Sequence, residues 1–165
     1  MLKTIGRMLG LWVLAEVLTL FLNLTLAFSG TVFRIVSAVC TVGILLALTA
    51  QGGISAAKDD KKAKRKPGAN SVIAGIAAML VPVLLTVLLA LSRAGVVGDG
   101  FYRWYKLLCA PFLSVCNLLS DDVVTSSLPG FGIPVLSVLC LLPGISAALA
   151  YRITAGDRSI DEVMY

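Results

Sequence analysis

Glu16 is the strongest candidate for a chemical role in this sequence, because it is a carboxylic acid inside a long apolar stretch. The stretch from Ile5 to Ala27 reads IGRMLGLWVLAEVLTLFLNLTLA, with Glu16 at its midpoint. A charged carboxylate at the centre of a bilayer costs about 2.5 kcal/mol or more, and intramembrane acids usually serve a function. Glu16 is therefore a candidate for coupling to a proton or another cation. The alternative is a neutral acid that is hydrogen-bonded for packing or that contacts a partner subunit.

Other polar or amphipathic residues accompany Glu16 on one side of the predicted helix. They follow the spacing i, i+4, i+7 and i+11, which places them on one face. The members of this stripe are Trp12, Glu16, Thr19 and Asn23. The opposite face is almost entirely Leu and Val. A polar face inside a membrane must look toward protein or a water-filled cavity, so we expect this stripe to face inward.

The next apolar stretch carries a second polar stripe, formed by Arg34, Ser37 and Thr41. In an antiparallel hairpin, a rise of about 1.5 Å per residue puts Thr41 level with Glu16, and Arg34 level with Asn23. A direct Glu16–Arg34 ion pair would have to span roughly 10 Å of depth, whereas Arg34 can reach the interface with its long side chain. We expect a polar seam along the hairpin and no tight ion pair. The candidate site for a substrate or coupling ion consists of Trp12, Glu16, Thr19, Asn23, Arg34 and Thr41.

Composition places the chain in a membrane. Of its 165 residues, 58% are hydrophobic and only 14% are charged, and the mean hydropathy is +0.95. Soluble proteins carry roughly a quarter charged residues. We therefore predict an all-α integral membrane protein, with residues 1–165 forming a single membrane domain.

Four stretches are long and apolar enough to be transmembrane helices: residues 5–27, 33–50, 71–91 and 133–151. A short connection around Ser29-Gly30 makes the first two an antiparallel hairpin. Residues 51–70, QGGISAAKDDKKAKRKPGAN, carry six cations between Lys58 and Lys66 and are predicted to be a solvated basic loop. Asn70 or Ser71 is the expected cap of the third helix.

Residues 92–132 form the outer segment, and its path relative to the membrane is harder to predict than that of the four spans. Residues 101–106, FYRWYK, combine four aromatics with two cations, as in an interfacial belt. The following LLCAPFLSVCNLL is 13 residues long and interrupted by Pro111, which is short for a span and suits an interfacial or re-entrant segment. We favour an amphipathic element lying on the outer leaflet. A fifth crossing is the alternative.

Small residues and prolines mark expected features of the last two spans. Gly75 follows Ser71 by four residues, and Ala78 follows Ala74 by four, a spacing that lets helices approach closely. Gly75, Ala74 and Ala78 are therefore predicted helix-packing positions. Pro82 and the pair Pro143-Gly144 interrupt the two spans near their centres and are predicted kinks. Interrupted helices can also mark a transporter's midplane site, but the sequence shows no convincing internal repeat.

Charge orients these spans. With the N-terminus inside, ten cations lie on the inner side and four on the outer side. The outer four are Arg34, Arg93, Arg103 and Lys106. This asymmetry satisfies the positive-inside rule, so we expect both termini in the cytoplasm and localisation to a bacterial cytoplasmic membrane. The concentration of cations in one run, without a folded soluble surface, argues against nucleic acid as a partner.

The residue types disfavour catalysis. The chain has no histidine, which removes the commonest general base and metal ligand. Its four cysteines, at 40, 109, 116 and 140, form no CxxC pair. The adjacent carboxylates Asp121 and Asp122 do not face one site on a regular element. We expect no enzyme activity, no metal and no cofactor.

A central glutamate in the first of four helices resembles the small multidrug transporters. The resemblance consists of Glu16 and the helix count, and that family lacks both the basic loop and the outer segment. It implies a small proton- or cation-coupled transporter that uses Glu16. The reading we favour is a non-catalytic subunit that binds partner helices within the bilayer, either those of another membrane protein or those of a second copy.

Overall fold

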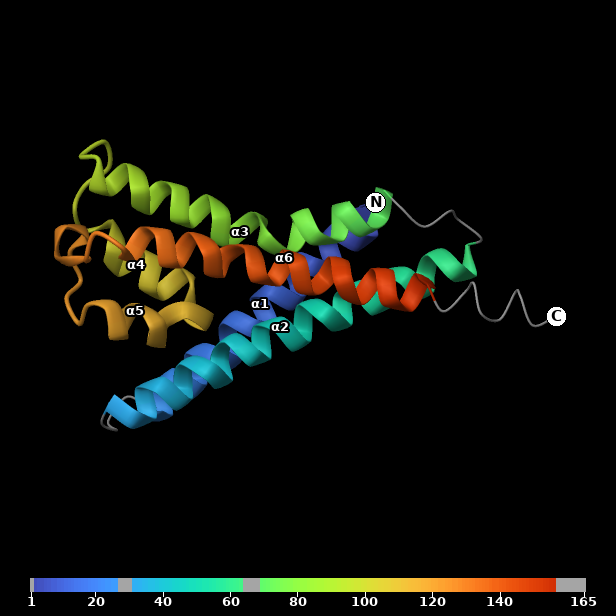
Figure 1. Ribbon diagram of the computed structural model, residues 1–165, viewed down its shortest axis with the longest axis horizontal. Helices are drawn as coiled ribbons and strands as arrows, with labels where there is room; N and C mark the ends of the chain where they lie inside the picture. The colour runs from blue at the N-terminus through green and yellow to red at the C-terminus, as the bar shows by residue number, and fades with distance from the viewer. Residues whose placement is uncertain (1, 27–30, 64–68, 157–165) are drawn as a thin grey trace.

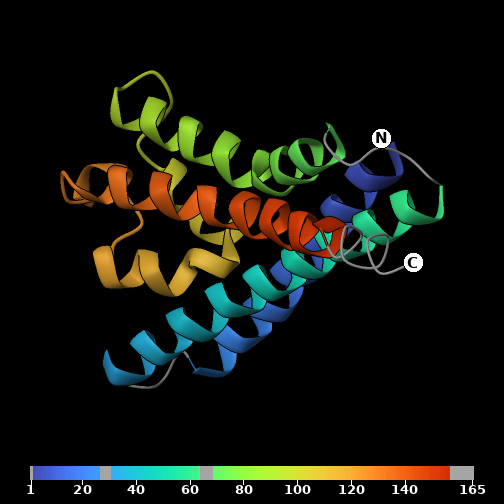
Figure 2. The same cartoon turned by 45° about the vertical axis from the view of Figure 1, so that its right-hand side comes forward.

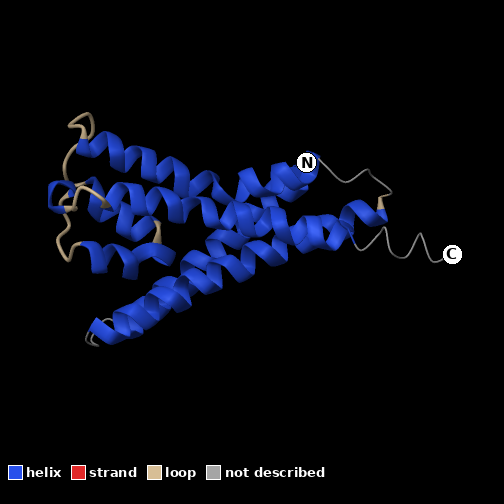
Figure 3. Cartoon of the chain, in the orientation of Figure 1, coloured by secondary structure: helices blue, strands red, loops and turns tan. Residues whose placement is uncertain are grey.

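Four long helices form the frame of the protein. The computed structural model describes residues 2–26, 31–63 and 69–156. The long helices are α1 (Leu2–Leu26), α2 (Thr31–Lys62), α3 (Ala69–Arg93) and α6 (Gly132–Gly156). Each is long and apolar enough to cross a bilayer, and the described residues contain helices and loops but no strand (Figure 3). The prediction of an all-α membrane protein is confirmed.

In Figure 1 the long helices form two pairs, α1 with α2 and α3 with α6, and α2 also packs extensively against α6 between the pairs. We call the end where α1 begins and α6 ends the terminal end. The opposite end, where α1 ends and α2 begins, is called the hairpin end after this pair of long helices. The pairs come together toward the terminal end and diverge toward the hairpin end (Figures 1 and 2). The space between the diverging pairs holds three short elements: α4 (Phe101–Leu108), η1 (Ala110–Phe112) and α5 (Leu113–Leu119).

These three short elements form a re-entrant hairpin, residues 101–119, and not an element lying on the surface. The segment enters from the hairpin end along α3, turns at η1 against α1 and α2, and returns along α2. Tyr102, Tyr105, Cys109, Phe112 and Cys116 are fully buried in it. The expected outer-leaflet element is thus corrected to a re-entrant one, and the segment makes no fifth crossing. The physical reason is that the aromatic and apolar side chains of both arms are buried against α1, α2 and α3, which an element lying on the surface could not achieve.

The second helix extends further than the sequence suggested. The predicted boundary at residue 50 is corrected, because α2 continues to Lys62 and includes Gly52 and Gly53. These glycines do not end the helix but lie in helix crossings. A Cβ atom on Gly53 would collide with the main-chain oxygen of Ala147 on α6, so the absence of a side chain permits this contact. Residues 64–68 of the predicted basic loop lie outside the described residues.

Adjacent carboxylates on the extended part of α2 join the helices at the terminal end. Asp59 accepts a hydrogen bond from Arg7 at 2.9 Å and lies 3.3 Å from the Lys3 ammonium, both on α1. Asp60 is buried and accepts hydrogen bonds from Asn70 of α3 at 2.7 Å and Tyr151 of α6 at 2.8 Å. Asn70 therefore lies inside α3 and binds Asp60, where a cap was expected.

Small residues mediate the contact of α3 with α6. Gly75 and Gly144 face each other so closely that a Cβ atom on Gly144 would lie 2.8 Å from the Gly75 oxygen. Ala74 and Ala78 are buried beside them. Pro82 and Pro143 both lie inside continuous helices. The Thr86 hydroxyl donates to the carbonyl of Pro82 at 2.8 Å, and the Cys140 thiol of α6 contacts the same carbonyl at 3.4 Å.

We predict that Gly53→Ala destabilises the protein by about 1–3 kcal/mol, because the new methyl group must displace the main chain of α6. Gly43→Ala on the same helix is the matched control, since nothing lies within 4 Å of its Cβ position. The control should be neutral or stabilising by up to about 1 kcal/mol, as alanine favours helix over glycine. Unfolding in detergent measures both variants. Equal effects of the two substitutions would contradict the close crossing.

Candidate functional site

The tip of the re-entrant hairpin is held by two polar side chains of α1. The main-chain N–H of Ala110 donates to Oε1 of Glu16 at 2.8 Å. The amide Nδ2 of Asn23 donates to the carbonyl oxygen of Ala110 at 2.9 Å. Glu16 and Asn23 are two helical turns apart, so together they bracket a single residue of the tip. We call Glu16, Asn23 and the main chain of Ala110 the tip clamp.

The local backbone explains why a clamp is needed. The helix α4 ends at Leu108, Cys109 has φ −125° and ψ 51°, and η1 begins at Ala110. This break removes Ala110 from the regular hydrogen-bonding pattern, and Pro111 contributes no N–H. Irregular backbone at membrane depth is tolerated only where protein or water satisfies its polar groups. Glu16 supplies the acceptor that the Ala110 N–H requires.

The carboxyl group of Glu16 is only half used by this contact. Its Oε2 atom is buried and has no hydrogen-bond partner among the described residues. Glu16 does not pair with Arg34, in agreement with the depth argument. Arg34 instead donates to Asp121, beyond the end of α5, at 2.6 Å.

A polar seam connects α1, α2 and α5 on the side of the tip that faces the hairpin end. Oδ1 of Asn23 accepts hydrogen bonds from Ser37 of α2 at 3.0 Å and from Ser114 of α5. The two serine hydroxyl oxygens are 2.9 Å apart. All three side chains are buried, so the seam joins the first helix pair to the returning arm of the re-entrant hairpin.

The remaining predicted site residues have other roles. The hydroxyl of Thr19 donates to Ala15 of its own helix at 2.7 Å, and that of Thr41 donates to Ala38 at 3.2 Å. Trp12 is buried in the apolar core. Of the six candidate residues, Glu16 and Asn23 therefore converge on one point, Arg34 lies toward the hairpin end, and the others pack between helices.

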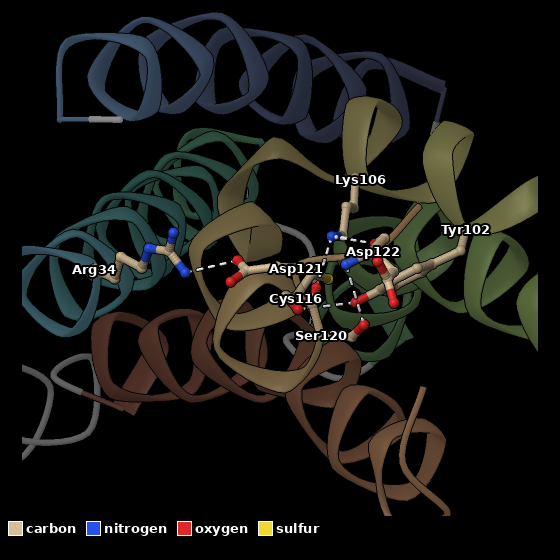
Figure 4. Close-up of polar contacts among 7 residues, drawn as sticks. All are labelled: Arg34, Tyr102, Lys106, Cys116, Ser120, Asp121 and Asp122. Atoms are coloured by element: carbon tan, nitrogen blue, oxygen red, sulfur yellow. Dashed lines mark hydrogen bonds and ion pairs between the residues drawn. The ribbon is translucent and has the colours of Figure 1, made fainter. Parts of the chain in front are cut away.

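The two arms of the re-entrant hairpin are tied together at its open end (Figure 4). Tyr102 donates to the Cys116 carbonyl at 2.9 Å. The Lys106 ammonium donates to the carbonyls of Ser120 and Asp122, each at 2.8 Å, and lies 4.6 Å from the centre of the Tyr102 ring. A cation favours the carbonyl end of a helix such as α5, and it also favours an aromatic face. These contacts close the hairpin independently of α1.

Sequence reasoning missed Ala110, Ser114 and Lys106 as participants. Ala110 takes part through its main chain, which leaves no side-chain signature. The available signal was Pro111 within a run too short to span the membrane, because such a break implies backbone groups that need partners from elsewhere.

Comparison of the chain with protein-family models, with curated proteins and with solved structures found no match. The likeness to the small multidrug transporters therefore remains one of Glu16 and helix count. In this structure Glu16 binds the re-entrant tip, which belongs to a segment that the transporter family lacks.

We predict that Glu16→Leu undocks the tip and exposes Cys109, which is fully buried next to Ala110. Loss of the acceptor leaves a buried N–H unsatisfied, which costs about 1–3 kcal/mol. N-ethylmaleimide should then label Cys109 about tenfold faster or more, as measured by peptide mass spectrometry in detergent.

Two comparisons control this labelling experiment. Glu16→Gln retains a side-chain oxygen as acceptor, so it should leave Cys109 protected. Cys140, buried between α3 and α6, should stay protected in both variants and report that the frame is intact. Unchanged labelling of Cys109 in Glu16→Leu would contradict the tip clamp.

Proposed function

We propose that the protein is a non-catalytic subunit of a membrane assembly. The observation that carries this proposal is the hydrogen bond from the Ala110 N–H to Glu16. A coupling acid must bind and release its ion with access to each side of the membrane in turn. Here the carboxyl group is engaged in holding the chain's own fold, which suits a structural role for the acid.

The outer faces of the frame suit binding to partner helices. On α3, large apolar side chains recur every three or four residues along one exposed stripe: Val72, Ile76, Leu80, Leu84 and Val87. Helix association in lipid is driven largely by van der Waals packing, which a continuous stripe of this kind can supply. The partner in this proposal is another membrane protein or a second copy of the chain.

The distribution of charge supports an orientation with both termini in the cytoplasm. The described cations near the terminal end are Lys3, Arg7, Lys58, Lys61, Lys62 and Arg152. Those near the hairpin end are Arg34, Arg93, Arg103 and Lys106. We propose that the terminal end faces the cytoplasm of a bacterial cell, as the positive-inside rule favours.

A second function, a small proton- or cation-coupled transporter, is favoured by one specific observation. Oε2 of Glu16 is buried without a hydrogen-bond partner among the described residues. A buried acid oxygen of this kind can be satisfied by binding a proton or a cation. The re-entrant hairpin also brings irregular backbone to the level of this acid, as transporters do at their binding sites.

Reconstituted vesicles separate the two functions. For a subunit, the wild-type protein should carry no proton flux above that of protein-free vesicles, as read by an internal pH-sensitive dye under an imposed pH gradient. Flux that is present in wild type and abolished by Glu16→Gln, with assembly intact, would establish the transporter and overturn the subunit proposal.

The assembly itself is tested on the outer face of α3. We expect Leu84→Trp to lower the mass of the complex, measured after mild detergent extraction, because the bulkier ring disturbs the packed face. Val17→Trp on the exposed face of α1 is the matched control and should leave the mass unchanged. A complex of unchanged mass in both variants would remove α3 as the assembly surface.

A further inference from the structure

A polar pocket lies beside the seam, at the hairpin end, between α1, α2 and α5. It is lined by Asn23, Leu24, Arg34, Ser37, Leu113, Ser114 and Asn117. Five of these side chains are polar, although the pocket lies between helices whose outer faces are apolar. Charged and polar side chains that face a cavity inside a membrane protein usually mark a binding site or an ion path.

The pocket offers more hydrogen-bond donors than acceptors. Arg34 uses one guanidinium nitrogen for Asp121, and the other N–H groups of its fork remain available. Asn117 makes no side-chain hydrogen bond within the described part of the chain. The Oδ1 acceptor of Asn23 is already occupied by Ser37 and Ser114. Arg34 is the charged residue of the lining, so a ligand that carries negative charge and acceptor oxygens suits this set.

The existing partner of Arg34 does not block such a ligand. Asp121 is largely exposed, and Arg34 is itself 40% exposed, so their ion pair resembles surface pairs, which contribute little. Figure 4 shows Arg34 on α2 reaching across to Asp121, which follows α5. Arginine binds phosphate through paired N–H groups with greater strength than it binds a single carboxylate oxygen.

The depth of Arg34 also fits an anionic group at the membrane surface. It lies in the first turn of α2, which begins at Thr31, and hence about 5 Å from the start of that helix. With the predicted span beginning at residue 33, this level corresponds to the boundary between headgroup phosphates and acyl chains. Leu24 and Leu113 provide apolar walls.

We propose that this pocket binds a phosphate group, carried by a phospholipid headgroup or present as the free anion. Arg34 supplies the positive charge and a forked pair of donors. Asn117 supplies a further donor from α5. Because the pocket joins the first helix pair to the re-entrant hairpin, the bound phosphate bridges the two.

The test is a binding measurement on the full chain in detergent, with dioleoylphosphatidic acid and inorganic phosphate as separate probes at constant ionic strength. Dioleoylphosphatidylcholine, whose phosphate is masked by choline, is the comparison lipid. We expect saturable binding of at least one phosphate probe. Competition between the probes identifies the phosphate group alone as the ligand, whereas binding of phosphatidic acid without competition identifies the lipid.

Matched variants localise the binding. Arg34→Gln should weaken binding about tenfold or more, as expected for losing hydrogen bonds to a charged group. Asp121→Asn breaks the same ion pair but keeps the guanidinium, so it should leave binding unchanged or tighter. Arg103→Gln, an exposed cation near the same end, should have no effect.

The proposal is overturned by any of three results. One is the absence of saturable binding of both phosphate probes to the wild-type protein. Another is an equal loss of binding in Arg34→Gln and Arg103→Gln, which would indicate general attraction to positive charge. The third is an equal loss in Asp121→Asn and Arg34→Gln, which would show that the ion pair, and not the guanidinium, maintains the pocket.

Discussion

A main-chain N–H placed between membrane helices must have an acceptor, and the structure around Ala110 depends on this constraint. Leaving such a group buried and unsatisfied costs about 1–3 kcal/mol. The break between α4 and η1 creates that requirement, and Glu16 meets it. Asn23 binds the carbonyl of the same residue. Because both side chains belong to one helix, they fix the depth and the position of the re-entrant hairpin relative to α1.

The two ends of the frame are held in different ways, and the difference makes room for the hairpin. Toward the terminal end, Gly53, Gly75 and Gly144 allow close helix crossings, and Asp60 joins α2 to α3 and α6. Toward the other end the pairs diverge (Figure 2), and the re-entrant hairpin fills the space with buried aromatic side chains. The tip clamp thus provides hydrogen-bond partners for the main chain of Ala110, which the close packing of the long helices does not provide.

Much of the frame could be predicted from the sequence, because apolar length and helical periodicity are local signals. The inward stripe of Trp12, Glu16, Thr19 and Asn23 followed from periodicity alone. The re-entrant path did not follow, since it depends on the partners that a distant helix offers to Ala110. Gly53 was misleading for a related reason: glycine suggests a helix end locally, but here it permits a contact with Ala147, almost one hundred residues away.

Amide hydrogen exchange at Ala110 tests the tip clamp most directly, measured by NMR on the protein in detergent micelles. The account predicts that the Ala110 amide is protected in wild type and in Glu16→Gln, and that Glu16→Leu accelerates its exchange about tenfold or more, as expected for loss of one hydrogen bond to a charged or polar acceptor. A freely exchanging Ala110 amide in wild type, or equal protection in Glu16→Leu, would contradict the claim that Glu16 holds the re-entrant tip.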